Sequence, residues 1–189
     1  MTRVKKALEE AEYFYVRMQE TENIPEEFRH NLNAFLSRAR SVTWVLKKDY
    51  SKNSRFKEWY VEKQRQMQCD ELMNFFVKAR NVSLKQEPIR PATSAYIRRI
   101  EIRNVPKGRG FAITREGEPV WIEKNEETGE EKRVHAREFD SEVARLYFFD
   151  KPKPPSGFES LHVIDLCKLY LGALRDLVEE ATRVLQTET

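Results

Sequence analysis

Two cations and a carboxamide lie close together in the run from Arg80 to Lys85 (RNVSLK), near the end of a predicted amphipathic helix. An Arg guanidinium holds a phosphate through several hydrogen bonds, and a Lys ammonium adds a second point charge. A Lys ammonium has three hydrogen-bond donors and no acceptor, so Lys85 holds an anion better than it removes a proton. These residue types could therefore hold an anion, with Arg80 and Lys85 as the binding groups and Asn81 ordering the site. The alternative is that Arg80 caps or ion-pairs the end of the helix.

Further polar side chains accompany the apolar stripe of the helix predicted over residues 28–46. His30, Asn33 and Arg40 could face a cleft shared with Arg80, and His30 would then supply a general base. The alternative is that these side chains lie on the solvated flanks of the helix. Both interpretations stay open, and the predicted anion-binding set is Arg80, Lys85, His30 and Arg40.

A second basic stretch lies between residues 98 and 137, within predicted strands. Alternate residues of a strand share one face, and aromatic side chains are interleaved with these cations. Such a surface would hold single-stranded nucleic acid, with bases stacked on aromatic rings and phosphates on cations. The alternative is a solvated sheet face whose arginines pair with glutamates, and the equal density of acids favours it. The cations are Arg98, Arg99, Arg103, Lys107, Arg109, Arg133, His135 and Arg137, the aromatics Tyr96, Phe111 and Trp121, and the acids Glu101, Glu116, Glu118 and Glu123.

The composition excludes several classes of protein. With 34 basic and 31 acidic residues, the net charge of +3 does not by itself indicate a nucleic-acid-binding protein. Cys69 and Cys167 form no CxxC pattern, so neither a disulfide framework nor a zinc site is predicted, and a cytoplasmic location fits. No signal peptide is predicted, and no segment approaches the roughly 18 apolar residues that span a bilayer. The three histidines are too dispersed for a metal site, and no motif indicates a cofactor.

Apolar residues recur at helical spacing in four stretches, residues 4–18, 28–46, 56–82 and 161–185. Pro25, followed by Glu26 and Glu27, predicts the start of the second helix. In the third stretch the apolar stripe shifts phase near Cys69 and Asp70, which predicts a kink or a restart with Asp70 as the cap. A heavy aromatic core, part of which could serve a dimer interface, is predicted from Trp44, Trp59, Tyr60, Phe75 and Phe76.

Pro88 and Pro91 end the helical region, and the apolar period then changes from about 3.6 to 2. Strands are predicted over 94–103, 111–115, 120–124 and 133–139, with 144–149 as a fifth, and glycine-containing turns favour antiparallel hairpins. The predicted fold class is mainly α with an inserted antiparallel β-sheet (α+β), an up-and-down four-helix bundle plus a small β-meander. We predict a single domain over 1–189, with the helical bundle at 2–86 and 157–187 and the β insertion at 94–149.

The helices, with Arg80 and Asn81 near the end of the third, resemble the HEPN superfamily, small helical bundles common in bacterial toxin, defence and RNA-processing systems. The resemblance covers residues 2–86 and 160–186 and does not account for the strands. The superfamily motif follows its Arg and polar residue with a His five positions after the Arg, and two motifs usually face each other across a dimer. Arg80 matches the phosphate-binding Arg and Asn81 the polar residue, whereas Lys85 occupies the position of the His.

The resemblance implies association with RNA or a nucleotide more readily than RNA cleavage, because the proton-transferring His is missing. It implies a cytoplasmic homodimer in which Arg80 and Asn81 are what is left of a catalytic site. An active form would be a metal-independent endoribonuclease with another base. The alternative is a non-enzymatic interaction or regulatory module, antitoxin-like, that keeps the bundle for dimerisation and binds a protein partner through its sheet.

Overall fold

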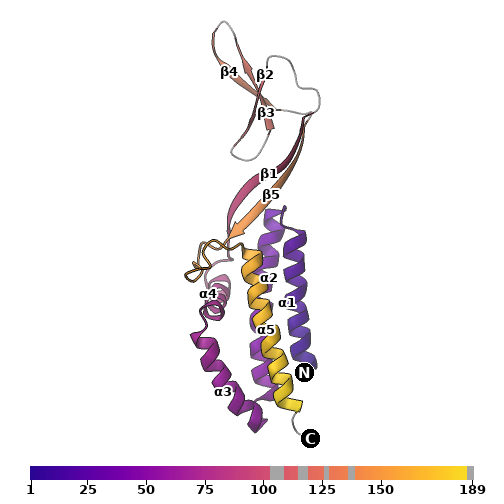
Figure 1. The fold of residues 1–189 in the computed structure, drawn as a ribbon, viewed down its shortest axis with the longest axis vertical. Coiled ribbons are helices and arrows are strands. Elements are labelled where there is room, and N and C mark those ends of the chain that lie inside the picture. Colours follow the sequence, from indigo (N-terminus) through magenta and orange to yellow (C-terminus); the bar gives the residue numbers. More distant parts are fainter. Residues whose placement is uncertain (103–108, 115–118, 126–127, 136–138, 187–189) are drawn as a thin grey trace. The chain divides into compact units, whose positions relative to one another are not determined.

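The computed structural model describes residues 1–102, 109–114, 119–125, 128–135 and 139–186. Over these residues the chain forms five helices and five strands, and all the strands lie between the fourth and fifth helices in sequence (Figure 1). The chain divides into two compact units, a helical unit (Met1–Thr93 with Tyr147–Thr189) and a strand unit (Ser94–Leu146). The predicted fold class, mainly α with inserted antiparallel strands, is confirmed.

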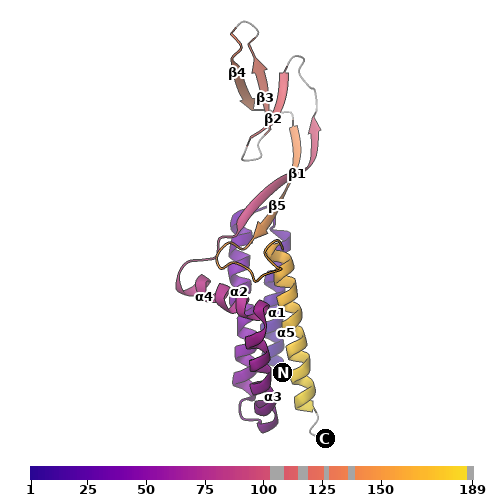
Figure 2. The same cartoon turned by 60° about the vertical axis from the view of Figure 1, so that its left-hand side comes forward.

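Three long helices run side by side in the helical unit (Figures 1 and 2): α1 (Thr2–Glu20), α2 (Pro25–Tyr50) and α5 (Val163–Gln186). Each buries one stripe of apolar residues against the others. Pro25 is the first residue of α2, and Glu26 and Glu27 lie in its first turn, as predicted. A proline loses no helical hydrogen bond at this position, and the acids complement the positive end of the helix dipole.

The third helical stretch consists of two helices, α3 (Ser54–Cys69) and α4 (Glu71–Lys85), which meet at Asp70. The Asp70 carboxylate accepts a hydrogen bond from the Met73 N–H at 2.9 Å, so a residue with extended backbone ends one helix and caps the next. The predicted restart with Asp70 as the cap is confirmed. The described residues therefore hold five helices, and the predicted up-and-down four-helix bundle is not confirmed.

The last helix begins later than the predicted second bundle segment, which starts at 157. Residues 157–162 form turns, and the Gly157 N–H donates to Glu159 Oε2 at 2.7 Å. The Gly157 backbone has a φ of 87°, a conformation that glycine tolerates and that no α-helix contains. The helix therefore starts only at Val163.

An aromatic cluster joins three helices in the core of the helical unit. The ring of Phe76 on α4 stacks on Tyr170 of α5, with centroids 4.2 Å apart, and meets Phe35 of α2 edge-on at 6.4 Å. Phe75 meets Phe149 edge-on at 4.9 Å. Such ring pairs contribute stability beyond the burial of their area, so the cluster fixes α4 against α2 and α5.

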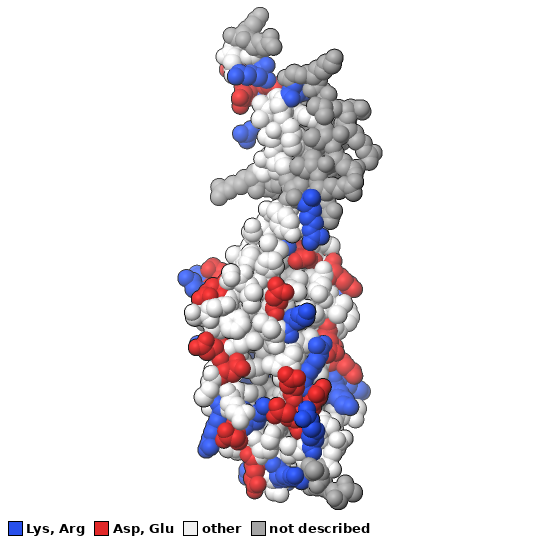
Figure 3. All heavy atoms as spheres, in the orientation of Figure 1, with Lys and Arg blue, Asp and Glu red and all other residues white. Residues whose placement is uncertain are grey.

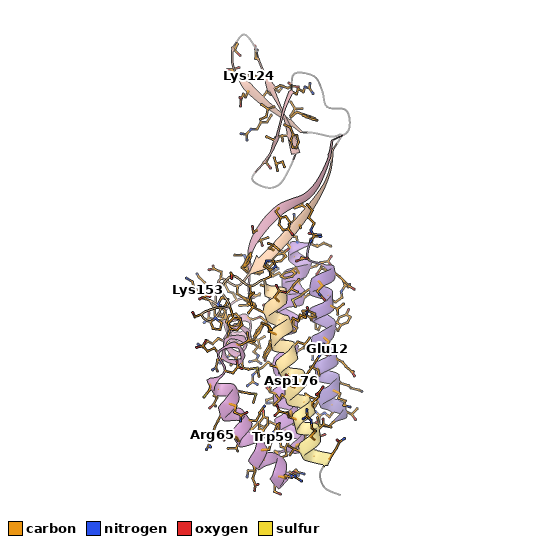
Figure 4. The ribbon with its side chains drawn as sticks, in the orientation of Figure 1. Glu12, Trp59, Arg65, Lys124, Lys153 and Asp176 are labelled. Atoms are coloured by element: carbon orange, nitrogen blue, oxygen red, sulfur yellow. The ribbon has the colours of Figure 1, made fainter. Side chains whose placement is uncertain are left out.

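Four of the five predicted core aromatics belong to the core. The buried ones are Tyr60, Phe75 and Phe76, and Trp59, labelled in Figure 4, is partly buried. The prediction is wrong for Trp44, whose side chain is 60% exposed. At this level α2 turns Thr43 and Leu46 inwards. Position 44 consequently falls on the outer flank of the helix.

The strands form two sheets. In the first, β1 (Ala92–Ile102) pairs with β5 (Phe139–Phe148), and in the second, β2 (Arg109–Ile113), β3 (Pro119–Lys124) and β4 (Glu131–His135) form an antiparallel meander in that order. Trp121 of β3 lies opposite Phe111 and Val134 in the register and is 5% exposed. Of the predicted strand over 133–139, residues 133–135 belong to β4 and residue 139 begins β5, and positions 136–138 lie outside the described residues. Positions 103 and 115 of the predicted strands lie outside the described residues.

Candidate functional site

The predicted phosphate-binding pair, Arg80 and Lys85, lies on α4 and is not brought together. Arg80 is half-buried, its Nη1 donates to Asn81 Oδ1 at 3.2 Å, and its Nε is buried without a hydrogen-bond partner among the described residues. Lys85 is exposed and is the last residue of α4. Five residues rotate about 500° around a helix axis, so the two side chains leave α4 about 140° apart. They therefore face different sides of the helix.

His30 lies on the exposed side of α2, near its start. Its Nε2 is 3.0 Å from Arg29 Nη2 and 3.9 Å from Glu26 Oε2. Arg29 also donates to Glu26 Oε2 at 2.5 Å, and this hydrogen bond lowers the pKa of the Glu26 carboxyl. These contacts stay within the first turns of α2 and do not involve Arg80. The structure thus gives His30 local partners rather than a place beside the Arg80 guanidinium.

Asn33 has a structural role. Its Oδ1 accepts from the Ile89 N–H at 2.8 Å and from Ser83 Oγ at 2.5 Å, and its Nδ2 donates to the carbonyls of Ile89 at 3.1 Å and Arg29 at 2.8 Å. These four hydrogen bonds use the full capacity of a carboxamide. Asn33 therefore ties α2 to the end of α4 and to the chain that leads into β1, and it has nothing left for a ligand.

Arg40 lines a pocket of about 420 Å³ in the helical unit, which we call the Arg40 pocket. Residues of α2, α3 and α4 form most of its lining, and Tyr170 of α5 completes it. Arg40 Nη1 donates to Thr43 Oγ1, less than one turn further along α2. This hydrogen bond orients the guanidinium from within its own helix.

Positive charge gathers where α2 lines the Arg40 pocket. Arg40 and Lys47 belong to the lining, no Asp or Glu does, and neither cation has an ion-pair partner among the described residues. Elsewhere on the helical unit the two signs of charge are interspersed, as Figure 3 shows for one face, and Arg38, for example, pairs with Glu10 at 3.0 Å. Because no carboxylate of the lining neutralises these cations, they attract an anion into the pocket.

Aromatic side chains supply a second part of the lining. Trp44 is exposed, and the Nζ of Lys48 lies 5.0 Å from the centroid of its ring. Tyr170 is 2% exposed, and its hydroxyl has no hydrogen-bond partner among the described residues. Burial raises the pKa of Tyr170 to about 12, although Arg40 nearby acts in the opposite direction. The phenol is therefore neutral at pH 7 and offers an O–H donor near the Arg40 guanidinium.

The sequence predicted four anion-binding side chains, and the structure places one in this pocket: Arg40 lines it, whereas His30, Arg80 and Lys85 do not. Sequence reasoning missed Trp44, Lys47 and Tyr170 as members of the site. The sequence could have indicated Trp44 and Lys47, because residues 40, 44 and 47 are spaced by four and three and share one face of a helix. Assigning Trp44 to the core concealed it.

The basic stretch on the strands divides into described and undescribed positions. Arg109 of β2 pairs with Glu123, directly opposite on β3, at 2.5 Å, so for this residue the alternative of an ion pair on a sheet face is confirmed. Arg98 and Arg133 are exposed. The remaining positions, or their side chains, lie outside what the structure describes: Arg99, Arg103, Lys107, His135 and Arg137.

Both cysteines are free. Cys69 is exposed, whereas Cys167 is buried, and burial raises the pKa of the Cys167 thiol well above its ordinary value. Among the described residues, no three His, Cys, Asp or Glu side chains are grouped as metal ligands would be. The described helices also include none with the length and apolar character that crossing a membrane requires.

Fold and site together define a mainly α-helical protein with a cationic, aromatic-lined pocket and a separate small strand unit. Residues 1–102 match the model of the family described as bacteriophage lambda protein ea47. Because this match covers more than half of the 189 residues, the chain belongs to the bacteriophage lambda protein ea47 family. The matched region holds α1 to α4 and β1, and with them the lining of the Arg40 pocket except Tyr170. No curated protein and no solved structure matches the chain.

Proposed function

We propose that this protein associates with RNA or with a nucleotide through the Arg40 pocket, as a HEPN-like protein of the cytoplasm. The observation that carries the proposal is the Arg40 guanidinium, without a carboxylate partner among the described residues, in one pocket with the exposed indole of Trp44. A phosphate and a nucleobase are the two groups that a cation and an exposed aromatic ring bind together.

Different residues of the pocket would bind the phosphate and the base of such a ligand. The guanidinium of Arg40 donates charge-assisted hydrogen bonds to phosphate oxygens, and Lys47 adds a second positive charge. Lys48 Nζ lies over one face of the exposed Trp44 ring, and the opposite face offers a surface on which a base stacks, an interaction worth about 1–3 kcal/mol per base. With a net charge of only +3 the whole chain attracts nucleic acid weakly, so affinity depends on these local contacts.

The proposed association is non-catalytic. Lys85 stands where the HEPN motif has its His, and His30 contacts Arg29 and Glu26. Neither side chain thus supports proton transfer at Arg80. A homodimer is part of the same proposal, because motifs of the HEPN superfamily usually face each other across a dimer.

Binding of a short, fluorescently labelled single-stranded RNA, measured by anisotropy over a range of salt concentrations, tests the proposal. The logarithm of the binding constant is expected to fall linearly with the logarithm of the salt concentration, by about 0.7 per phosphate contact. Arg40→Ala is expected to weaken binding about tenfold, as the loss of a charged hydrogen bond does, and to reduce the slope by about 0.7.

Arg38→Ala is the matched control. Arg38 lies on the same helix, pairs with Glu10 at 3.0 Å and does not line the Arg40 pocket. Its removal changes the net charge as much as Arg40→Ala does, but is expected to leave the affinity close to that of the unmodified chain. Equal losses in the two variants would show that only net charge matters and would contradict the proposal.

A protein-interaction module is the second candidate function, and exposed apolar side chains on two neighbouring helices favour it. Tyr13 and Val16 of α1 are 59% and 47% exposed, and Leu169 of α5 is 46% exposed. Tyr13 and Val16, three residues apart, share one face of α1, and a contiguous exposed apolar patch is typical of a protein interface. An absence of RNA binding at low salt in the anisotropy experiment would favour this candidate over the first.

A further inference from the structure

We infer that the Arg40 pocket accepts a single nucleotide and contacts the edge of its base through carboxamide side chains, with adenine as the preferred base. This inference rests on the proposed function and names its ligand. A pocket for one nucleotide binds a free mononucleotide, whereas a surface that follows a strand requires several linked phosphates. The two kinds of site therefore give different results with small ligands.

The dimensions of the pocket fit one nucleotide. Its volume of about 420 Å³ lies toward the lower end of the roughly 300–1,000 Å³ that small-molecule sites occupy. Tyr60 and Tyr170, which are 5% and 2% exposed, line its buried side, and the exposed Trp44 lines its open side. A base against the indole leaves its phosphate within the cationic lining of Arg40 and Lys47. Any further nucleotides of a strand would lie in solvent.

Three carboxamides from α3 and α4 line the same pocket: Gln64, Gln68 and Asn74. The Asn74 Nδ2 donates to the backbone carbonyl of Gln68 at 2.5 Å, which holds this group in place and leaves its Oδ1 to accept a hydrogen bond. The side chains of Gln64 and Gln68 have no hydrogen-bond partner among the described residues. Each carboxamide presents a donor beside an acceptor, so the lining offers several such pairs to a ligand.

The type of these groups favours adenine. Adenine carries an amino donor next to a ring-nitrogen acceptor, and the carboxamides of Asn and Gln match that pair with two hydrogen bonds. Guanine presents adjacent N–H donors on its pairing edge, which a carboxylate accepts best, and no Asp or Glu lines the pocket. The Arg40 guanidinium also matches the acceptor edge of guanine. A preference for guanine is therefore the result that would reverse the base assignment.

Calorimetric titration of the 189-residue chain with small ligands tests the inference. Adenosine 5′-monophosphate is expected to bind about tenfold more tightly than ribose 5-phosphate, which lacks the base, because a stacked base strengthens binding about five- to 150-fold. It is also expected to bind more tightly than adenosine, which lacks the phosphate, and than guanosine 5′-monophosphate. Equal binding of adenosine 5′-monophosphate and ribose 5-phosphate would overturn the inference.

Gln64→Glu provides a test that a folding defect cannot imitate. This change replaces an unpaired carboxamide of the lining with a carboxylate, and is expected to shift the preference from adenosine toward guanosine 5′-monophosphate. Gln66→Glu is the matched control, because residue 66 lies on the same helix but outside the lining of the Arg40 pocket. Its base preference is expected to stay that of the unmodified chain, and an equal shift in both variants would overturn the role of Gln64.

The failure of this inference can be told apart from the failure of the proposed function. If RNA binds in an Arg40-dependent manner while ribose 5-phosphate binds as well as the complete nucleotide, the single-nucleotide pocket is wrong and the proposed function stands. If neither RNA nor a nucleotide binds, both are wrong. Tighter binding of guanosine than of adenosine 5′-monophosphate by the unmodified chain overturns the assignment of the base.

Discussion

Replacing Phe76 with Ala is expected to lower the free energy of unfolding of the helical unit by about 3–5 kcal/mol. The side chain is 1% exposed, and its ring stacks on Tyr170 at 4.2 Å and meets Phe35 and Phe149 at 6.4 and 6.1 Å. Its removal costs the transfer free energy of the ring and leaves a cavity where α2, α4 and α5 meet. Tyr170 loses its stacking partner, so the lining of the Arg40 pocket loses support as well.

Urea unfolding followed by far-ultraviolet circular dichroism measures this loss. Leu84→Ala is the control on the same helix, because Leu84 is 55% exposed and its removal leaves no cavity. We expect that variant to stay within about 0.5 kcal/mol of the unmodified chain. A loss smaller than about 1 kcal/mol for Phe76→Ala would contradict its place at the centre of the core.

Asn33→Leu is expected to reduce the free energy of unfolding by about 2–4 kcal/mol, although it changes little of the side-chain volume. The substitution removes four hydrogen bonds at once and leaves the N–H and the carbonyl of Ile89, a residue that is 2% exposed, without partners. Each buried polar group that loses its partner costs about 1–3 kcal/mol. Urea unfolding gives the total.

Ser83→Ala is the control for Asn33→Leu, because it changes the same region but leaves the other three hydrogen bonds of Asn33 in place. It removes only the hydroxyl that donates to Asn33 Oδ1, so we expect a loss of about 1 kcal/mol. Hydrogen exchange supplies a local readout, because the Ile89 N–H is expected to lose protection in Asn33→Leu and keep it in Ser83→Ala. Protection of the Ile89 N–H that survives in both variants would rule out the carboxamide as its anchor.

Local sequence signals predicted the helices well. The apolar stripes indicated α1, α2 and α5, because apolar residues at helical spacing lie on one face of the helix, and this face is the one that is buried. The restart at Asp70 was predictable for the same reason, since the phase shift and the capping carboxylate lie within a few residues of each other. The exposure of Trp44 was not predictable, because it depends on which flank of α2 the neighbouring helices leave uncovered.

The candidate site could be predicted only in part. Arg40 was identified from its residue type and helix, but its pocket is assembled from residues between 40 and 77 together with Tyr170, and packing alone brings these together. The separation of Arg80 from Lys85 needed no structure, because a spacing of five residues falls between helical faces. The network around Asn33 joins groups 56 residues apart in the chain, which no local pattern records.

The central claim is that Arg40 and Trp44 hold a nucleotide or the nucleotides of an RNA. An NMR titration of the 189-residue chain, followed by the indole N–H signals of its three tryptophans, tests this claim most directly. Trp44 is exposed and lines the pocket, Trp59 is partly buried, and Trp121 is buried in the strand unit. On addition of adenosine 5′-monophosphate or of short single-stranded RNA, the Trp44 signal is expected to shift until it saturates, while the Trp121 signal stays in place. A Trp44 signal that does not move with either ligand, or three signals that move alike, would contradict the claim.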